Sequence, residues 1–484
     1  MPPGRGPTAT QLVQLALDAG AEPFTHEGRP YLRVREGDNH ETFPLGTRGT
    51  EARQWLHRLS RRESECVPGP EALDGALGAL AAEAGTGPER SVWQRVGRPA
   101  ENAIVIDRGT PDHRAFVVGP GQWAEGPSPI DFLRSRKSLE LPGADHDGAI
   151  ESLRPFINLD GESDWYLTVA WLVAALWPEG PYPLLLLSGQ AGTAKSTAAR
   201  VLRALVDPSR APIRALPRDV RNLAVAARWN RCLVFDNVSS IPTEISDALC
   251  QLSTGGGFAH RKLYTDDEEE VFTEERPVIV TSIEQVVVRG DLLDRAILIE
   301  LPVIPRSRQQ AEADFWRDFG RAKPAILGGL LGVVARVLAL LPDIHLSEMP
   351  RMADFARLGV AVEGACRWPP GSFLDSYGER LTEASEEAVA ASPIGELIVG
   401  LAKGEGCVAS SQDLLQRLSD RSGRSPVDLA KDRAWPTSPR ALSGQLKRLA
   451  PDLLRAHSVI VARPQRTSSK RLWSIRIDDA GSPS

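Results

Sequence analysis

An apolar strand that runs directly into a glycine-rich loop and a helix is the feature that most constrains how this chain folds. LLLLS, from Leu184 to Ser188, precedes GQAGTAKST, from Gly189 to Thr197, and the helical sequence AARVLRALV. In such a loop the backbone N–H groups and the helix N-terminus bind anionic phosphate oxygens. The order of strand, loop, Lys-Ser and helix therefore predicts a P-loop.

Every position of this loop is expected to bind nucleotide, with ATP and Mg²⁺ as cofactors. Lys195 brings positive charge to the β- and γ-phosphates, and the Ser196 hydroxyl is a magnesium ligand. Ala194 replaces the glycine of the motif, and a left-handed backbone there costs about 1 kcal/mol. The alternative is a glycine-rich turn without nucleotide. The predicted nucleotide-binding residues are Gly189, Gln190, Ala191, Gly192, Thr193, Ala194, Lys195, Ser196 and Thr197.

Three more apolar segments alternate with helical sequence after the loop. They are CLVFD (Cys232 to Asp236), PVIVTS (Pro277 to Ser282) and AILIEL (Ala296 to Leu301). Near-continuous apolar strands between helices are typical of a parallel sheet covered on both faces. The predicted fold class is therefore α/β, with a P-loop NTPase core.

Asp236 ends the second of these strands, and ligands of open α/β sheets bind at that end. It is the predicted magnesium acid beside Ser196, with a strand-capping role as the alternative. Asn237 follows as a candidate catalytic residue; an amide positions water but cannot take its proton. Glu244 and Asp247 are substitutes for that role unless they are only exposed helix charges.

Two later segments supply the predicted sensor residues and the last predicted catalytic residue, which joins Lys195, Asp236 and Asn237. Thr281 and Ser282 end the third strand and are candidate sensors of the γ-phosphate. Arg295 precedes the fourth strand, where an arginine at a subunit boundary stabilises transition-state charge in a neighbour. The alternatives are a structural pair with Asp291 or Asp294, or Arg289 in place of Arg295.

The stretch LSTGGGFAHRKLYTDDEE (Leu252 to Glu269), followed by a strand and DLLDR, resembles superfamily 3 helicases of the AAA+ class. The likeness is to the ATPase part of phage and plasmid primase-helicase proteins, over about residues 150 to 390. It implies a homo-oligomeric ring, such as a hexamer, in which His260, Arg261 and Lys262 contact single-stranded DNA. The alternative is a charge cluster neutralised by the acidic run Asp266 to Glu270. This chain departs from the pattern of such helicases at two places. They usually have a second acidic residue at the position of Asn237, and an asparagine sensor at the position of Thr281 or Ser282.

Length and pattern divide the 484 residues into four parts. These are an α+β module (1–145), the AAA+ core (150–305), a helical extension (306–388) and a C-terminal domain (389–484). The N-terminal module shows no primase signature, so a separate chain is expected to supply any primase or polymerase. The five cysteines lack CxxC spacing, and no signal or membrane-spanning segment is evident, which favours the cytoplasm without membrane contact.

The C-terminal domain is predicted to be a winged helix. Helices begin at Ser410 or Ser411 and at Ser438, followed by the strands SVIVAR and RLWSIRI. Between Lys431 and Arg476 the chain has eleven Lys or Arg and two Asp, although its net charge is -6. This excess favours DNA binding, with protein docking as the alternative. The predicted duplex contacts are Arg440, Lys447, Arg448, Arg466, Lys470 and Arg471.

These features favour a DNA-dependent ATPase, a ring helicase or origin-melting factor of a phage, prophage or plasmid replication module. A slow ATP-gated DNA-binding regulator or defence switch is the rival, because Asn237 permits nucleotide binding with little turnover. A small-molecule kinase is disfavoured, since it leaves the basic C-terminal region unexplained.

Overall fold

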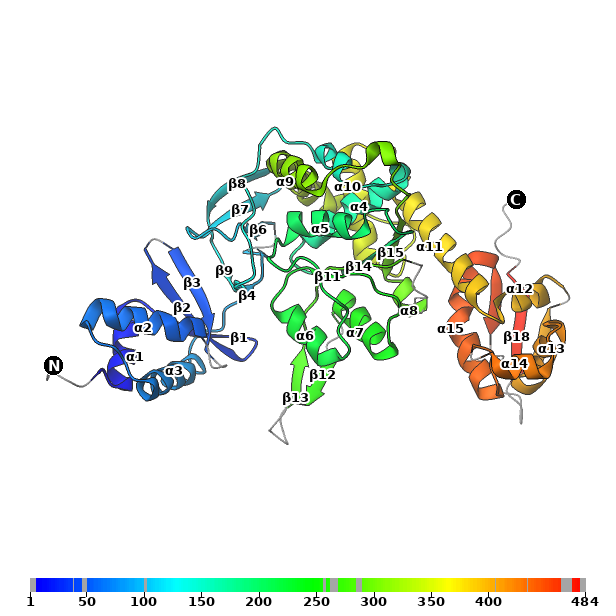
Figure 1. Ribbon diagram of the computed structural model, residues 1–484, viewed down its shortest axis with the longest axis horizontal. Coiled ribbons are helices and arrows are strands. Elements are labelled where there is room, and N and C mark those ends of the chain that lie inside the picture. Colours follow the sequence, from blue (N-terminus) through cyan, green and yellow to red (C-terminus); the bar gives the residue numbers. More distant parts are fainter. Residues whose placement is uncertain are drawn as a thin grey trace.

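A four-stranded parallel sheet lies at the centre of the computed structural model (Figure 1). The structure describes residues 6–478 except 38, 46–49, 100–101, 256–257, 262–268, 284–289, 405, 433 and 463–471. The order across the sheet is β11-β14-β10-β15, and every neighbouring pair is parallel. The strands are β10 (Leu184–Ser188), β11 (Leu233–Phe235), β14 (Val278–Thr281) and β15 (Ala296–Glu300). The predicted α/β class and its four apolar strands are confirmed.

Alternate residues of these strands pack on opposite faces, because successive side chains of a strand point to opposite sides. Leu185 and Leu187 belong to one core cluster, and Leu184 and Leu186 belong to another. The first cluster lies under α4, α5, α9 and α10, and the second under α6, α7 and α8. The bounds of the helices not given below are α4 (Gly161–Ala175), α5 (Lys195–Val206), α6 (Val220–Arg228), α7 (Thr243–Thr254) and α8 (Gly290–Leu293).

The segment predicted to be helical after residue 310 forms three long helices. Helix α9 is long and apolar enough to cross a bilayer, but 61% of its apolar window is buried inside the chain. More than half of this window therefore packs against the rest of the chain. The helices are α9 (Glu312–Leu340), α10 (Ala353–Cys366) and α11 (Ser372–Ala391), with the 3-10 helices η1 (Ile150–Phe156), η2 (Arg306–Arg308) and η3 (Leu341–Asp343).

The N-terminal residues form a small antiparallel sheet with three helices and a core of their own. Thr8 starts the first helix with a capping box, in which its hydroxyl and Gln11 bond reciprocally to backbone N–H groups. The elements are α1 (Ala9–Asp18), β1 (Glu22–His26), β2 (Arg29–Glu36), β3 (Asn39–Pro44), α2 (Thr50–Ser64) and α3 (Pro70–Ala84).

A second antiparallel sheet, of order β5-β6-β7-β8, joins this module to the core. It contains an antiparallel pair of strands, β6 and β7, with Ile104 opposite Val118. Phe116 packs into the same cluster as α4 and α9, and the Gly121 N–H donates to the Ala335 carbonyl at 2.8 Å. The strands are β4 (Val92–Trp93), β5 (Val96–Gly97), β6 (Ile104–Asp107), β7 (Arg114–Gly119), β8 (Gln122–Pro127) and β9 (Asp131–Phe132).

The C-terminal region has a separate core and a three-stranded antiparallel sheet of order β16-β18-β17. Ser410 and Ser438 cap helices, as predicted, by accepting a backbone N–H with their side chains. The elements are α12 (Gly395–Lys403), β16 (Cys407–Ser410), α13 (Ser411–Arg421), α14 (Pro426–Lys431), α15 (Pro439–His457), β17 (Val459–Ala462) and β18 (Leu472–Ile477).

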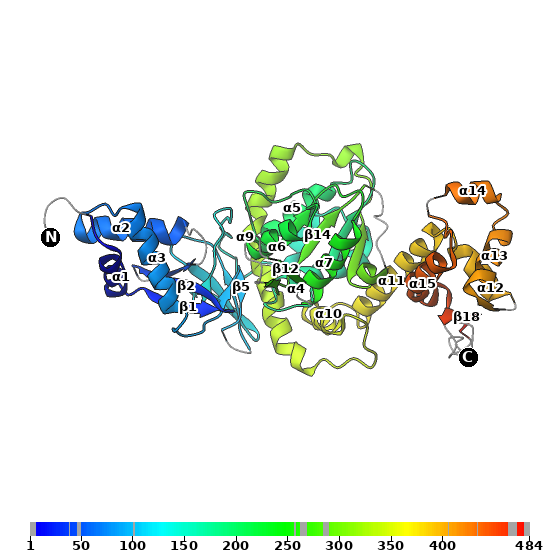
Figure 2. The ribbon, with the colours of Figure 1, turned by 90° about the horizontal axis from the view of Figure 1, so that it is seen from below.

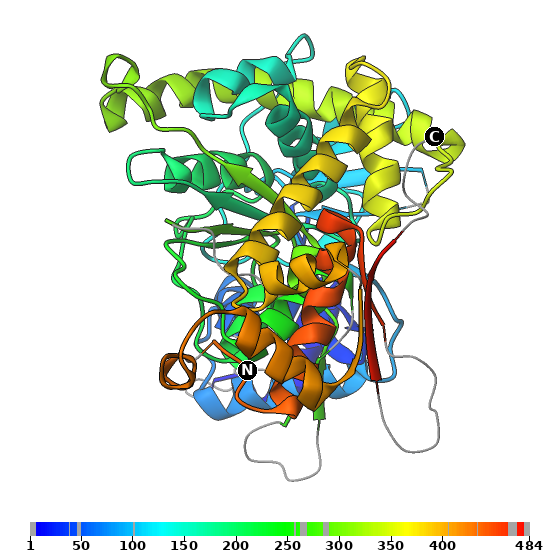
Figure 3. The ribbon, with the colours of Figure 1, turned by 90° about the vertical axis from the view of Figure 1, so that its right-hand side faces the viewer.

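The N-terminal module and the C-terminal domain lie at opposite ends of the molecule, with the parallel sheet between them (Figure 2). Helix α11 runs out of the core and packs along α15 (Figure 3). The hairpin of β12 (Phe258–Arg261) and β13 (Glu269–Phe272) projects from the core on the side of α6 and α7 (Figure 1).

Candidate functional site

The loop between β10 and α5 needs residues that tolerate a left-handed backbone. Gly189 has φ +140°, and a Cβ added there would lie 2.6 Å from the Leu301 carbonyl oxygen. Gly192 has φ +86°. Ala194, at the N-cap of α5, has φ 63° and ψ 31°, so the left-handed conformation considered for this position is present.

Lys195 bends back over the loop rather than pointing into solvent. Its Nζ donates to the carbonyl oxygens of Gly189 (2.6 Å) and Gln190 (2.8 Å). Burial lowers the pKa of Lys195, and the nearby Asp236 carboxylate partly opposes that shift. The ammonium group therefore lies inside the ring of backbone atoms that the loop forms.

Asp236 connects the ends of three strands through its Oδ1 atom. The Ser196 Oγ donates to this oxygen at 2.7 Å, and the Thr281 Oγ1 donates to it at 2.5 Å. The Asn237 N–H in turn donates to the Thr281 Oγ1 at 3.0 Å. Because β14 lies between β10 and β11, Thr281 is placed between the loop and Asp236. Ser196, Asp236, Asn237 and Thr281 are thus brought together, as sequence reasoning expected.

The remaining residues near this edge differ in their surroundings. Asn237 has φ 55°, a conformation that asparagine adopts more readily than most residues. Ser282 is buried, and its N–H donates to the Leu187 carbonyl at 3.0 Å, so it extends the sheet. Glu244 and Asp247 have exposed side chains in the first two turns of α7.

Asn158 is a residue of this site that sequence reasoning missed. Its Nδ2 donates to the Pro302 carbonyl at 2.5 Å and to the Thr193 carbonyl at 3.4 Å. It thereby ties the loop to the segment after β15. Nothing in the local pattern INLD distinguishes this asparagine, because the contact depends on packing between segments far apart in the chain.

Arg295 lies at the amino ends of the parallel strands, opposite the ends that carry the Gly189–Thr197 loop. Its carbonyl accepts the Leu184 N–H at 2.9 Å, whereas the loop follows Ser188, which pairs with Glu300. Five residues of strand span about 16 Å, so Arg295 does not reach the loop of its own chain. Asp294 pairs with Arg351 (2.6 Å) and Arg455 (2.8 Å). The reserve candidate Arg289 is outside the described residues.

Helix α15 has the two faces that its sequence predicts. Leu442, Leu446 and Leu449 are buried in the C-terminal core. The predicted DNA contacts on the same helix, Arg440, Lys447 and Arg448, are exposed. This places three cations on the solvent side of one helix.

The other predicted DNA contacts are only partly described. His260 and Arg261 lie on β12, where their backbones pair with Glu270 and Glu269 of β13. Lys262, Arg466, Lys470 and Arg471 lie outside the described residues.

Two family models match the chain. Residues 150–383 match the model described as Actinomycete integrative conjugative element replication protein, and residues 394–484 match the AICE RepA C-terminal domain. Together the matched segments cover roughly two thirds of the chain. No curated protein matches it.

Solved structures are similar to the chain at low identity. One is the A form apo structure of the NrS-1 C terminal region, with 11% identity, coverage of 98% of this chain and 100% of that chain, and a TM-score of 0.41. Another is the apo structure of the same region, with 10% identity, the same two coverages and a TM-score of 0.41.

Proposed function

Because this chain is a replication protein of a conjugative element, we propose that it is an ATPase that uses ATP to unwind or remodel DNA. The observation that carries the proposal is the Ser196–Asp236 hydrogen bond, 2.7 Å long, beside the Gly189–Thr197 loop. A hydroxyl at the start of a helix and an acid at the end of a neighbouring strand are the pair that binds magnesium in P-loop NTPases.

The loop has the geometry and charge that a triphosphate requires. The left-handed residues Gly189, Gly192 and Ala194 fold the backbone around the position of Lys195. In our proposal a bound phosphate replaces the carbonyl partners of the Lys195 ammonium, and the N–H groups at the start of α5 bind its oxygens. Magnesium, when bound by Ser196 and Asp236, neutralises negative charge on the phosphates.

Thr281 is proposed to sense whether the terminal phosphate is present. Its hydroxyl already bonds to Asp236 and to the Asn237 backbone, and its strand lies between the loop strand and the acidic strand. A change in the ligands of Asp236 therefore alters the partners of Thr281 directly. This arrangement supports the AAA+ interpretation of the core.

Two surfaces are proposed to bind DNA. The C-terminal order of helix, strand, helices, long helix and two-stranded hairpin supports a winged helix, with the exposed cations of α15 facing duplex. The β12–β13 hairpin is proposed to carry His260, Arg261 and Lys262 to a single strand.

Arg295 is proposed to act on a neighbouring subunit of a homo-oligomeric ring, because it lies at the edge of the sheet away from its own loop. An Arg295→Ala chain and a Lys195→Ala chain are then each inactive alone. Mixing them restores part of the ATP hydrolysis, since one type of interface has both residues intact. Mixtures that stay inactive count against action between subunits.

A second candidate function is a slow ATP-gated switch on DNA, and Asn237 is the residue that favours it. An amide positions water without accepting a proton, so nucleotide binds while hydrolysis stays slow. In this version ATP binding controls DNA binding.

ATP hydrolysis measured with and without single-stranded DNA separates the two candidates. The ATPase proposal predicts that DNA stimulates turnover, that duplex with a single-stranded tail is unwound, and that Lys195→Ala abolishes both. If wild-type chain binds ATP but DNA neither stimulates turnover nor is unwound, the switch replaces the motor.

A further inference from the structure

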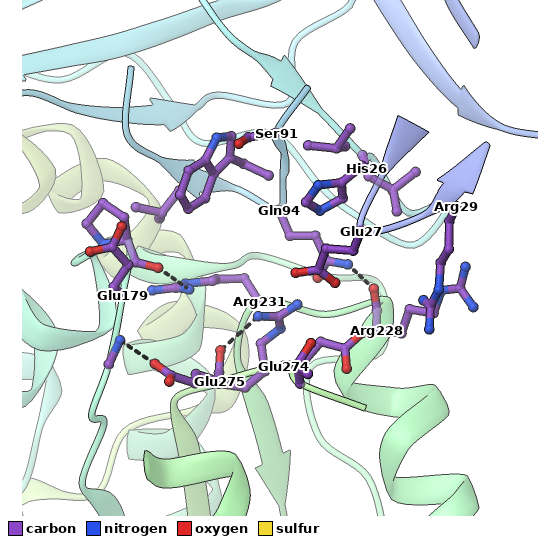
Figure 4. A pocket seen from close by; sticks show the side chains of 18 of the residues that line it. His26, Glu27, Arg29, Ser91, Gln94, Glu179, Arg228, Arg231, Glu274 and Glu275 are labelled. Carbon is purple, nitrogen blue, oxygen red and sulfur yellow. Dashed lines mark hydrogen bonds between the residues drawn. The ribbon is translucent and has the colours of Figure 1, made fainter. Parts of the chain in front are cut away.

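A cavity of about 440 Å³ lies between the N-terminal module and the core, at the amino ends of the parallel strands (Figure 4). The Gly189–Thr197 loop is at the carboxyl ends, so the two sites are on opposite edges of the sheet. The wall from the N-terminal module carries His26, Glu27 and Tyr31, and the opposite wall carries Arg228, Glu274 and neighbouring residues. Ligand sites commonly have this size and form between modules.

The walls of the cavity are held in place by contacts within the N-terminal module and across its boundary with the core. Glu89 accepts the Thr25 hydroxyl at 2.6 Å and the Glu27 N–H at 2.7 Å, which fixes the β1–β2 turn. Gln94 donates its amide to the Arg228 carbonyl. Burial raises the pKa of Tyr31, and the opposing effects include a hydrogen bond with Arg228, which crosses from α6 to the N-terminal module. The cavity is therefore preformed.

The floor of the cavity holds two guanidinium groups whose hydrogen bonds go to uncharged groups. Arg231 donates to the Ala175 carbonyl at 3.2 Å and to the Tyr182 hydroxyl at 2.8 Å, and Arg276 donates to the Ala227 carbonyl at 3.0 Å. Burial, with Arg231 adding to it, lowers the pKa of Arg276 to about 10. The Glu274 and Asp207 carboxylates oppose this shift only in part, so a further anionic group beside the two guanidinium groups is favoured.

Two of the four glutamates in the lining are already engaged. Glu275 accepts the Gly180 N–H at 2.7 Å, and Glu179 pairs with Arg98 at 3.8 Å. By contrast, the Glu274 Oε2 and the Gln94 Oε1 are buried and lack a hydrogen-bond partner in the part of the chain that the structure describes. A buried acceptor without a donor costs about 1–3 kcal/mol, which a ligand N–H group removes.

We propose that this cavity binds one nucleotide whose base carries an exocyclic amino group. The phosphate lies toward the guanidinium groups, the base lies against Tyr31 and Trp93, and its amino group donates to Glu274. The residues Thr273 to Arg276 follow β13 directly and line the cavity. A DNA strand that runs along the β12–β13 hairpin therefore reaches the cavity. That source of the nucleotide rests on the proposed DNA function; a free mononucleotide is the other source of the same chemistry.

The test uses the full chain with Lys195→Ala, so that the phosphate loop does not contribute to nucleotide binding. Binding of dAMP is compared with that of dTMP, and an oligo(dA) strand with an oligo(dT) strand, because thymine has no exocyclic amino group. We expect adenine to bind about tenfold more tightly, the effect of one charge-assisted hydrogen bond. Adding Glu274→Ala removes this preference, whereas Glu348→Ala, at an exposed loop position outside the cavity, leaves it intact.

The outcomes distinguish a DNA strand from a free mononucleotide as the ligand. They also distinguish failure of the cavity proposal from failure of the proposed ATPase function. A Glu274-dependent preference in the oligonucleotides alone assigns the cavity to a DNA strand, and the same preference in dAMP assigns it to a free nucleotide. Absence of any adenine preference, or a preference that survives Glu274→Ala, overturns the nucleotide site. All chains in this test carry Lys195→Ala, so the measured adenine preference does not depend on ATP hydrolysis. If DNA fails to stimulate ATP hydrolysis in the wild-type chain, the adenine preference still stands.

Discussion

At the scale of residues, a single carboxylate oxygen organises the candidate site. The Asp236 Oδ1 accepts hydroxyl groups from Ser196 and Thr281, which belong to different strand–loop junctions. Asn237 joins this network through its backbone N–H, which donates to the Thr281 hydroxyl. That hydrogen bond does not involve the Asn237 side chain. The proposed catalytic weakness of the site thus lies in the chemistry of one amide side chain.

Asn237→Asp is expected to speed ATP hydrolysis. Aspartate tolerates the left-handed backbone at φ 55° and supplies a carboxylate that accepts the proton of the attacking water. A positioned general base contributes about 10²-fold or more, so we expect at least a tenfold increase in kcat with unchanged ATP affinity. Steady-state kinetics on the purified chain measures this, and an unchanged kcat assigns the base to another residue such as Glu244.

Ala194 is expected to respond to substitution in the direction opposite to a helical alanine. Ala194→Gly relieves left-handed strain and gains about 0–1 kcal/mol after the entropy of glycine is included, whereas Ala194→Val loses about 2 kcal/mol. Ala204→Gly, inside α5, is the matched control and loses about 1 kcal/mol. Urea unfolding measures all three. A loss for Ala194→Gly equal to that of the control contradicts the assigned backbone.

At the scale of elements, the strands could be predicted but their order could not. Nearly every position is apolar in the four strand sequences LLLLS, CLVFD, PVIVTS and AILIEL. Burial of the sheet on both faces could therefore be predicted from the sequence. That β14 separates β10 from β11 depends on hydrogen bonds between distant segments. Sequence reasoning expected Ser196, Asp236 and Thr281 near one another because each follows the carboxyl end of a strand, and it missed Asn158, whose contacts depend on packing between distant segments.

A buried polar junction connects the core to the C-terminal domain, and it too was invisible in the sequence. Arg455, near the end of α15, donates to Asp294 at 2.8 Å and to the Ser385 hydroxyl at 3.0 Å. Ser385 donates in turn to Asp452 at 3.2 Å. Helix α15 therefore has its exposed cations in the first turn and in the middle, and this junction, whose Asp294 precedes Arg295, near its C-terminal end.

Asp452 makes the stability of this junction depend on pH. Burial, with the Asp294 charge adding to it, raises the pKa of Asp452 to about 6, while Ser385 and Arg455 oppose the shift. The folded chain then binds more protons at this residue than the unfolded chain between about pH 4 and pH 6, so stability falls as pH rises through that window.

Asp452→Asn is expected to remove that fall. The neutral amide keeps the shape of the side chain, so above pH 6 the variant gains about 1–2 kcal/mol once solvent screening is allowed for. The midpoint of urea unfolding measured from pH 4 to pH 8 tests this. A wild-type profile that is flat in this range, or a variant with the same slope, contradicts the assigned shift.

At the scale of the whole molecule, the proposed sites for ATP and for DNA lie in different places. The Gly189–Thr197 loop lies at one edge of the sheet, the β12–β13 hairpin projects from the core, and the C-terminal domain lies at the end of the molecule beyond α11 (Figure 1). Sequence reasoning predicted the loop and a separate C-terminal domain from pattern and charge, but not the β12–β13 hairpin. It did not predict the cavity at the opposite edge of the sheet, which requires residues from modules far apart in the chain.

The salt dependence of duplex binding tests the role of α15. Lys447→Ala with Arg448→Ala is expected to reduce the slope of log affinity against log salt by about 1 to 2, because each phosphate contact releases counterions. Arg61→Ala with Arg62→Ala, an adjacent exposed pair on α2, is the control with the same change in charge. If the slope of log affinity against log salt is the same in the two double variants, α15 is not part of the DNA interface.

Magnesium-dependent ATP binding tests whether the Gly189–Thr197 loop, with Ser196 and Asp236, is a nucleotide site. We expect the wild-type chain to bind ATP, and Mg²⁺ to strengthen this binding. Ser196→Ala should lose most of the gain from Mg²⁺, and Lys195→Ala should lower the affinity about tenfold or more with or without the metal. Isothermal calorimetry of the three chains measures each of these values. A wild-type chain that does not bind ATP, or a Lys195→Ala chain that binds it equally well, contradicts the account.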